Sequence, residues 1–402
     1  MVTVHTMARD DLSPTALTLC DLTQSYSEKG GGIRTYLTEK RAFIERETDH
    51  QHLLIIPGPE DKITENGRLI TAEIKSPKVP GSPNYRLLLR NKAVRKILRD
   101  YMPSSIECLD AYNLPWAAIR HKREFGDVSL VAGYRTDFPT AYVQRLLSPY
   151  IGGWAAGKLR NRAYEYAGKL YAEFDKVYTL NSAMAEKLGN LGVPDVDILP
   201  LGVDLEAFSP ARRDESLRES YGVAPDTPLL IYVGRIDDEK RPDIIFEAFT
   251  QLPPEMNAAL IMLGEGNYVE DLQKRSAGMN VHFPGFIKDR ADLGRYLASA
   301  DMYVSAMAFE TFGISIIEAQ AAGLPVIGVM GGAMPDRVPS NLGRLGPIGD
   351  AAAMAENISS LWQSGAHADM SLAARAHVEA NFSWRRTFER LFEEIYRDTI
   401  GA

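Results

Sequence analysis

The sequence is poor in cysteine and lacks long apolar runs. Its only two cysteines, Cys20 and Cys108, stand inside short apolar stretches that are typical of strands. Two such residues do not supply a disulfide framework or a cysteine metal site, so we expect buried, reduced thiols. No stretch approaches about eighteen uninterrupted apolar residues, and the N-terminus lacks the basic-then-apolar layout of a signal peptide. We therefore expect a cytoplasmic protein with no membrane span.

Basic residues are not in excess either. Lys and Arg number 45 against 53 Asp and Glu, which gives a formal net charge of -8. General nucleic-acid binding needs a dominant basic surface, so we expect no nucleic-acid partner. The 402 residues exceed what one hydrophobic core usually organises, and we expect two domains.

Short apolar runs alternate with helical stretches along the whole chain. The first series of expected strands lies at 16–22, 52–57, 105–110, 129–136, 176–181 and 196–201. A polar segment with prolines follows, and the series restarts at 228–234, 258–264, 280–286, 301–306 and 325–330. Short apolar strands between helices predict parallel sheets that are covered on both faces. The expected fold class is therefore α/β, with two Rossmann-like domains.

Ligands of such sheets bind beyond the carboxyl ends of the strands, so the loops that follow strands are the candidate sites. The first of these loops, SEKGGGIRTYLTE, places Gly30, Gly31 and Gly32 before a helix expected to start near Ile33. Glycines allow a ligand to approach the backbone, and a helix N-terminus offers free N–H groups to an anion. The run matches neither the dinucleotide fingerprint nor a P-loop, and a flexible turn explains it equally well.

The second series opens with YVGRIDDEKRPDIIFEAF. Gly234 ends the strand, Arg235 follows it, and Lys240 stands near the start of the next helix. Two cations beside a strand end and a helix N-terminus favour a diphosphate site. A solvated pair beside the acidic DDE run is the alternative. The next strand ends at Gly264 and Gly266, where a turn or a close approach to a base would each require glycine.

The stretch FETFGISIIE separates Glu310 from Glu318 by eight residues, with Phe312 and Gly313 between them. This spacing predicts a loop that carries Glu310, a turn at Gly313, and a helix that carries Glu318. By itself Glu318 is explained by the helix dipole, which favours acids in the first turns. The anion-suited loops on the corresponding strand ends favour a ligand site instead.

From about residue 196 to residue 330 the chain strongly resembles the retaining glycosyltransferases of family 4. The matching runs are LPLGVDLEAFSP, YVGRIDDEKRPDIIFEAF, LIMLGEG, PGF and LGRYLASADMYVSAMAFETFGISIIEAQAAGLPVIG, and the E-x7-E spacing is that family's signature. GGGIRTYLTE and NSAMAEKLGNLGV match more loosely. The resemblance implies the GT-B fold, with two Rossmann-like domains whose parallel sheets face a central cleft. It implies an acceptor-side domain over 1–203, a donor-binding domain over 204–383, and a C-terminal helix, 384–402, that crosses back to the first domain.

The resemblance also implies roles for individual residues. Arg235 and Lys240 would bind the donor diphosphate, Glu318 the ribose hydroxyls, and Glu310 the hydroxyls of the donor sugar. The backbone positions that would approach the donor are Gly31, Gly32, Gly234, Gly264, Phe312, Gly313 and Ile314. The implied donor is a nucleotide-diphosphate hexose of the GDP-mannose or UDP-glucose type. The implied enzyme is a retaining hexosyltransferase that needs no metal, and the chain has no Asp-x-Asp pair at a strand end.

The chain departs from the family pattern at two positions. In GYRTDFPTAY, Arg135 stands where the family has a histidine near the donor sugar, and Asp336 stands where it usually has a glutamate. A guanidinium stays charged and cannot shuttle a proton, so Arg135 is expected to bind phosphate or an acidic group. Asp137 is then the nearest ionisable group to assist the acceptor hydroxyl. A mutual Arg135–Asp137 ion pair is an equally good interpretation.

The sequence indicates the acceptor-binding residues less clearly than the donor-binding ones. A basic stretch carries Arg86, Arg90, Lys92, Arg95, Lys96 and Arg99 among apolar residues. Such a helix could dock on an anionic bilayer and suit a lipid or lipid-linked acceptor, but we favour a plain surface helix. Trp154 and Tyr164 could line an acceptor groove, and buried packing is the favoured alternative.

The main hypothesis is a glycosyltransferase that takes a nucleotide-sugar donor and a lipid or saccharide acceptor, with possible peripheral contact at the cytoplasmic membrane face. A nucleotide-sugar epimerase of the same fold would instead consume the donor with no acceptor present. A non-catalytic sugar-nucleotide-binding module is the third interpretation, and Arg135 in place of histidine motivates it. The oligomeric state leaves no signature in the sequence.

Overall fold

The computed structural model describes residues 16–26, 32–79 and 82–397. The chain divides into two compact units. One comprises Met1–Leu199 together with Phe388–Ala402, and the other comprises Pro200–Thr387. The boundaries expected after residue 203 and before residue 384 each lie four residues from these.

The first unit is built on an eight-stranded sheet with the strand order β10-β9-β8-β7-β1-β2-β4-β3. The strands are β1 (Thr18–Leu22), β2 (Gln51–Gly58), β3 (Lys62–Asn66), β4 (Leu69–Lys75), β7 (Ser105–Cys108), β8 (Ser129–Tyr134), β9 (Lys176–Thr179) and β10 (Val196–Ile198). All neighbours pair in parallel except β3, which runs antiparallel to β4. The six strands expected in this half are confirmed. The sequence prediction missed β3 and β4. The residues of β3, KITEN, are mostly exposed and form no apolar run, and those of β4, LITAEIK, mix apolar with polar residues.

Helices pack on this sheet and, together with its strands, form the hydrophobic core of the first unit. They are α1 (Gly32–Glu47), α2 (Asn91–Tyr101), α3 (Pro115–Phe125) and α6 (Ser182–Asn190), and a small two-stranded sheet pairs β5 (Lys78–Val79) with β6 (Ser82–Arg86). Helix α1 buries Tyr36, Lys40 and Phe43 on one face at the spacing of a helical turn. Cys20 and Cys108 are buried free thiols, as expected.

The last helical segment begins in the second unit and enters the first unit at Phe388. It consists of α15 (Trp384–Arg390) and a π-helical turn, Leu391–Tyr396. The ring of Phe388 lies 5.5 Å from that of Tyr36, and the hydroxyl of Tyr396 donates to Glu107 at 2.6 Å. The expected return of the C-terminal helix to the first domain is confirmed.

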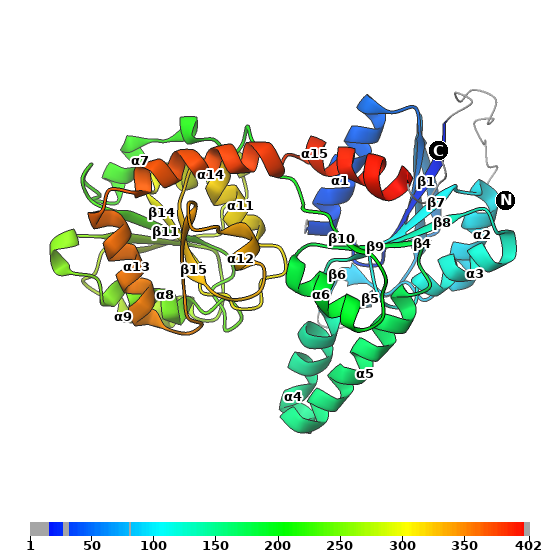
Figure 1. Cartoon of the computed structure of the whole chain (residues 1–402), viewed down its shortest axis with the longest axis horizontal. Helices are drawn as coiled ribbons and strands as arrows, with labels where there is room; N and C mark the ends of the chain where they lie inside the picture. The colour runs from blue at the N-terminus through cyan, green and yellow to red at the C-terminus, as the bar shows by residue number, and fades with distance from the viewer. Residues whose placement is uncertain (1–15, 27–31, 80–81, 398–402) are drawn as a thin grey trace. The chain divides into compact units, whose positions relative to one another are not determined.

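A helical hairpin extends from the first unit. A π-helical segment, Pro139–Gln144, leads into α4 (Arg145–Ile151), and Gly152 joins α4 to α5 (Gly153–Tyr171). Figure 1 shows α4 and α5 side by side and directed away from the sheet of this unit. The base of α5 is attached by Tyr166, whose hydroxyl donates to the carbonyl of Tyr112 at 2.9 Å.

The second unit has a six-stranded, fully parallel sheet with the order β13-β12-β11-β14-β15-β16. The strands are β11 (Leu229–Val233), β12 (Ala259–Leu263), β13 (Val281–Gly285), β14 (Met302–Val304), β15 (Val326–Val329) and β16 (Gly343–Gly346). Its helices are α7 (Glu215–Ser220), α8 (Pro242–Thr250), α9 (Val269–Arg275), α10 (Arg290–Ser299), α11 (Ile314–Ala321), α12 (Met334–Arg337), α13 (Ala351–Gln363) and α14 (His367–Asn381). The five expected strands are confirmed, and β16, with the sequence GRLG, was missed.

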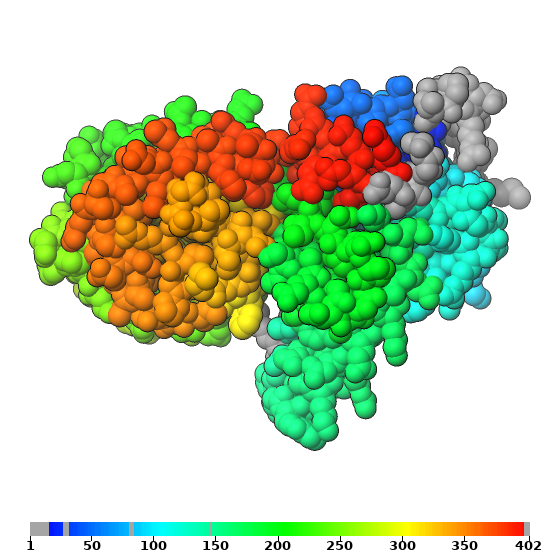
Figure 2. Space-filling view, viewed as in Figure 1, coloured from blue at the N-terminus to red at the C-terminus, as the bar shows by residue number. Residues whose placement is uncertain are grey.

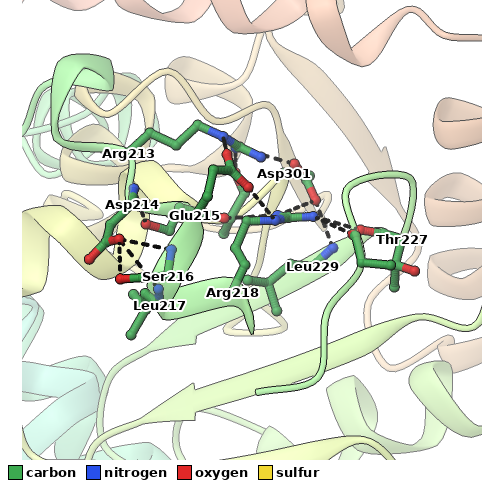
Figure 3. Close-up of polar contacts among 12 residues, drawn as sticks. Arg213, Asp214, Glu215, Ser216, Leu217, Arg218, Thr227, Leu229 and Asp301 are labelled. Carbon is green, nitrogen blue, oxygen red and sulfur yellow. Dashed lines mark hydrogen bonds and ion pairs between the residues drawn. The ribbon is translucent and has the colours of Figure 1, made fainter. Parts of the chain in front are cut away.

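A buried arginine joins the start of this sheet to the preceding helix (Figure 3). Arg218 on α7 is 1% exposed and donates to Asp301 at 2.9 Å and to the carbonyl of Thr227 at 2.8 Å. The same carboxylate of Asp301 accepts the backbone N–H of Leu229 at 2.8 Å. Because Leu229 begins β11 and Asp301 precedes β14, this one charge cluster holds together the amino ends of two neighbouring strands.

Candidate functional site

The carboxyl ends of β11 and β14 bring together two residues that the sequence singled out. Glu310 lies in the loop after β14, and Lys240 lies in the turn between β11 and α8. The Nζ atom of Lys240 is 2.9 Å from Oε2 of Glu310, and both side chains are largely buried. The expected sugar-binding carboxylate and the expected diphosphate-binding cation therefore form one ion pair.

Arg235 lies two residues after the end of β11, and its side chain is 58% exposed. It pairs with Asp237 and lies 2.6 Å from a carboxylate oxygen of Glu239. Burial opposes the charged form, but the bond to Glu239 and the charges of both carboxylates raise the pKa of Arg235 above its usual value. The acidic DDE run thus neutralises the arginine locally, and a bound phosphate would have to compete with it.

Glu318 is buried on α11 and has a cationic partner. Nη2 of Arg290 donates to Oε1 of Glu318 at 2.9 Å. Burial raises the pKa of Glu318, and the Arg290 charge offsets part of that shift. The other carboxylate oxygen, Oε2, has no hydrogen-bond partner among the described residues.

The sequence prediction missed Arg290. It is the first residue of α10, and the Asp289 side chain caps that helix by accepting the N–H of Asp292 at 2.8 Å. A capping aspartate followed by arginine, just after the strand that ends at Gly285, was the available signal.

The turn between Glu310 and Glu318 has the expected geometry. Gly313 has a φ of 78° and precedes α11, and a Cβ there would lie 2.6 Å from Cδ1 of Ile316. This left-handed conformation favours glycine. Phe312 is buried, and its carbonyl accepts from Nε of Arg337 at 3.1 Å. Ile314 is 41% exposed and begins the helix, so the first-turn N–H groups lie at the surface end of α11.

Close backbone contacts explain the strand-end glycines. A Cβ on Gly264, whose φ is 140°, would lie 1.9 Å from the carbonyl oxygen of Gly234. A Cβ on Gly332 would lie 2.4 Å from the carbonyl oxygen of Glu310, and that oxygen accepts the N–H of Ala333 at 2.8 Å. Gly332 was missed, although the Gly-Gly pair after β15 is visible in the sequence.

The first unit contains a cavity of about 470 Å³ at the carboxyl ends of β1, β7 and β8. Its walls include Gly32, Tyr85, Asp110, Tyr112, Arg135 and Phe138. Gly32 begins α1, so the expected helix start is confirmed, whereas Gly30 and Gly31 lie outside the described residues.

Arg135 is a buried cation in the wall of this cavity. Its Nε and Nη2 donate to the hydroxyl of Tyr178 at 3.2 and 2.7 Å, and its guanidinium lies 3.6 Å from the ring centroid of Tyr36. Burial opposes the charge, but the phenols of Tyr178 and Tyr36 and the carboxylate of Glu107 raise the pKa of Arg135 above its usual value. The guanidinium is therefore kept charged, and two hydrogen bonds and one ring contact fix its orientation.

A chain of buried polar groups lies behind Arg135. Tyr178 donates to Glu107, which also accepts from Lys40 at 2.7 Å, and Lys40 lies 2.6 Å from Asp21. His52 lies 2.7 Å from the other oxygen of Asp21. These polar groups connect β1, β2, β7, β9 and α1 to one wall of the cavity. They also connect the C-terminal segment, because Tyr396 donates to Glu107 as well.

Asp137 does not pair with Arg135, so the interpretation of a mutual ion pair is wrong. Its carboxylate accepts from Tyr164 at 2.7 Å and from Tyr134 at 3.1 Å, and Lys187 lies 3.3 Å away. It is also not among the residues that line the cavity. These contacts are those of a residue that positions α5, and its assignment as an acceptor-side base stays a prediction.

Asp110, which the sequence reading passed over, does line the cavity. One oxygen accepts from the hydroxyl of Thr23 at 2.7 Å and from the N–H of Gln24 at 2.6 Å, and the other accepts from Ser25. Burial raises the pKa of Asp110, and these hydrogen bonds offset part of the shift. A carboxylate directly after β7, at the ligand-binding edge of the sheet, was the available signal.

The basic stretch around α2 is a surface helix, as favoured. Its apolar residues Val94, Leu98 and Tyr101 are buried in the core. Most of its cations are paired with carboxylates: Arg90 with Asp61 at 2.5 Å, Arg95 with Glu124 at 2.7 Å, and Lys96 with Asp100 at 2.6 Å.

Trp154 contradicts the favoured interpretation of buried packing, because it is 76% exposed on α5. Tyr164 is partly buried and bonded to Asp137, and neither side chain lines the cavity. Asp336 lies on the short helix α12, partly buried.

Within the described ranges, no group of three or more His, Cys, Asp or Glu side chains is arranged to hold a metal ion. No described helix is long and apolar enough to cross a membrane.

Solved structures share this architecture over nearly the whole chain. The sucrose-phosphate synthase of Thermosynechococcus elongatus matches with a TM-score of 0.72 at 20% identity, covering 94% of this chain and 99% of that one. The Anabaena protein HepE in complex with UDP matches with a TM-score of 0.69 at 18% identity, covering 95% and 99%. The two Rossmann-like units therefore define a GT-B fold.

Family models and curated relatives give the family. The model for glycosyl transferases group 1 matches residues 213–377, and the model for glycosyltransferase family 4 matches residues 30–207. The chain belongs to the family 4 glycosyltransferases and is a glycosyltransferase. A GDP-mannose-dependent alpha-(1-6)-phosphatidylinositol dimannoside mannosyltransferase of Mycobacterium tuberculosis is 28% identical over 307 residues, 75% of this chain and 76% of that protein. A GDP-mannose-dependent alpha-mannosyltransferase of Corynebacterium glutamicum is 26% identical over 359 residues, 88% and 82%.

Proposed function

We propose that this enzyme transfers a hexose from a nucleotide-diphosphate sugar to a lipid, lipid-linked or saccharide acceptor, with retention of configuration. The observation that carries the proposal is the Lys240–Glu310 ion pair at the carboxyl ends of β11 and β14. In this proposal Lys240 binds the phosphate and Glu310 binds the sugar hydroxyls, and the contact between the two side chains supports a shared site. The names of two relatives specify GDP-mannose, which favours that donor over UDP-glucose.

Each donor group has a proposed partner in the second unit. Lys240 and Arg235 stabilise the charge that develops on the leaving diphosphate, a task that needs no metal ion when fixed cations perform it. Glu310 binds the sugar hydroxyls from its loop. The free oxygen of Glu318 accepts from the ribose hydroxyls, while Arg290 keeps the carboxylate in place.

We assign the acceptor to the first-unit cavity, where Arg135 presents a fixed cation. A guanidinium with this burial suits a phosphate or carboxylate on the acceptor or donor. Because it cannot take up a proton, the acceptor hydroxyl must lose its proton to another group, and the leaving phosphate oxygen is our candidate.

Two measurements test this proposal. Thermal unfolding with GDP, UDP and ADP should show a rise in Tm with one of them, since a ligand that binds only the folded state stabilises it. Incubation with the matching nucleotide sugar and candidate acceptors should yield a glycosylated product. Glu318→Ala should lose both effects, while Glu270→Ala, an exposed change on α9, should retain them. The absence of a shift with every nucleotide would overturn the donor site, and donor consumption without acceptor would favour an epimerase.

A further inference from the structure

The free end of the α4–α5 hairpin gathers exposed apolar side chains. Tyr150 is 85% exposed and Trp154 is 76% exposed, and Ile151 between them is also exposed. Figure 2 shows the hairpin as a column that extends beyond the rest of the first unit. Single exposed hydrophobic residues need no explanation, but three within five positions at the end of a projecting element form a patch.

The stem next to this patch is basic, although the whole chain is acidic. Helix α5 carries four basic residues, Lys158, Arg160, Arg162 and Lys169, against a single glutamate. Among the described residues, Lys158, Arg162 and Lys169 have no ion pair. The ammonium of Lys158 lies 3.9 Å from the ring centroid of Trp154, which brings charge directly against the apolar tip.

Helix α2 provides a comparison within the same unit. It has as many basic residues, but its apolar residues Val94 and Leu98 are buried, and three of its four cations, Arg95, Lys96 and Arg99, are paired with carboxylates. The tip of the hairpin differs from α2: Tyr150, Ile151 and Trp154 are exposed, and the described cations Lys158, Arg162 and Lys169 have no ion pair with a described residue. An aromatic tip beside unpaired basic residues is the arrangement that binds an anionic lipid surface, where Trp and Tyr lie at headgroup level.

We infer that the tip of the α4–α5 hairpin docks the enzyme on an anionic membrane. Tyr150, Ile151 and Trp154 insert at the headgroup boundary, and Lys158 and Arg162 bind the lipid phosphates. The biological role of docking rests on the proposed lipid-type acceptor, since docking would bring the enzyme to the surface that holds such an acceptor. Docking itself requires neither donor nor acceptor.

The full-length protein can be tested with vesicles alone. Flotation should show binding to phosphatidylcholine vesicles that contain phosphatidylglycerol, and weaker binding to pure phosphatidylcholine. Lys158→Gln with Arg162→Gln should weaken binding about twenty-five-fold, because each basic residue near an anionic surface contributes about fivefold. Tyr150→Ser with Trp154→Ser should abolish it. Tm and far-UV circular dichroism would establish that these variants fold.

Matched control variants test whether vesicle binding depends on this hairpin or on basic and apolar residues elsewhere. Lys92→Gln with Lys96→Gln removes two charges from α2, and Leu372→Ser removes an exposed apolar residue from α14; both should bind vesicles as the parent does. Brominated lipid should quench tryptophan fluorescence in the parent and not in Trp154→Phe, which retains three other tryptophans.

Three results would overturn the inference. The first is that the parent does not bind anionic vesicles, and the second is that the hairpin variants bind them as well as the parent does. The third is that the parent is a dimer that binds no vesicles and that Tyr150→Ser with Trp154→Ser converts to a monomer. The last would make the tip an interface between copies of the chain. The Tm shifts with nucleotides test the donor site separately. Failure of the donor site and failure of membrane docking can therefore be told apart.

Discussion

Arg290, on the first turn of α10, holds the buried carboxylate of Glu318 on α11 at a distance of 2.9 Å. The pair leaves one carboxylate oxygen without a partner in the described part of the chain. Because burial raises the pKa of Glu318 and Arg290 counteracts that shift, the arginine decides over which pH range the carboxylate stays ionised.

Nucleotide affinity should therefore depend on pH through Glu318. As pH falls towards the raised pKa of Glu318, its carboxylate becomes protonated and accepts ribose hydroxyls less well, so the Kd should rise. Arg290→Met removes the charge that lowers this pKa and should move the loss of affinity to higher pH. Titration calorimetry with the preferred nucleotide measures both. In Glu318→Gln the affinity should be weaker and lack this pH dependence; an unchanged pH profile would show that Glu318 does not contact the nucleotide.

Substitutions of Lys240 and of Glu310 should affect nucleotide binding and sugar transfer to different extents. Lys240→Met removes the proposed phosphate contact and should weaken nucleoside-diphosphate binding about tenfold or more. Glu310→Gln should leave nucleotide binding nearly intact and lower kcat about a hundredfold, since its proposed contact is with the reacting sugar. Lys274→Met, an exposed change on α9, is the control. Equal losses of nucleotide affinity in both variants would assign Glu310 to the nucleotide instead.

Arg135 should act on one substrate more than on the other. Arg135→Lys keeps the charge but loses the two bonds to Tyr178 and the planar contact with Tyr36. If the cavity holds an anionic acceptor, the KM for the acceptor should rise about tenfold and the KM for the donor should change little. Tyr178→Phe leaves Arg135 in place without its hydroxyl partner and should show a smaller effect in the same direction. A change confined to the donor KM would move Arg135 to the donor phosphate.

The folded protein should lose stability in mild acid. Burial lowers the pKa below the usual 6.5 for His50, His52, His121, His282 and His377. The unfolded chain then binds more protons than the folded one below about pH 6.5, so stability falls as pH decreases. Burial alone would raise the pKa of Asp21, but Lys40 and His52 hold it well below its usual 3.8, which adds a further loss at lower pH.

Urea midpoints between pH 8 and pH 5 measure this effect. The midpoint should fall steadily on the acid side of about pH 6.5. His52→Gln removes one of the buried imidazoles and should reduce the slope, whatever it does to stability at pH 8. A flat profile over this range would contradict the assignment of buried, neutral histidines.

Alanine substitutions of two glycines should change the free energy of unfolding in opposite directions. Gly264→Ala places a Cβ 1.9 Å from a backbone oxygen at a φ of 140° and should cost about 2–4 kcal/mol. Gly189→Ala, in α6 with nothing within 4 Å of the added Cβ, should stabilise by up to about 1 kcal/mol. Urea unfolding measures both, and a neutral Gly264→Ala would show that the strand ends can separate.

Local patterns in the sequence were sufficient for the architecture of the site. The short apolar strands predicted both sheets, because residues buried on both faces form unbroken apolar runs. FETFGISIIE predicted a loop carboxylate, a glycine turn and a helix carboxylate, which depend on neighbouring residues alone. The polar edge strand β3 was not predictable in this way, since β4 supplies its hydrogen bonds.

The sequence by itself determined the fold class, the strand ends and which residue types stand there. Only the tertiary structure decided their partners: Arg290 for Glu318, Tyr178 for Arg135, and Tyr164 for Asp137. It also decided that Trp154 faces solvent while the equally apolar residues of α2 are buried. The physical reason is that pairing and burial depend on which segments, distant in the chain, meet across a sheet, and local periodicity does not carry that information.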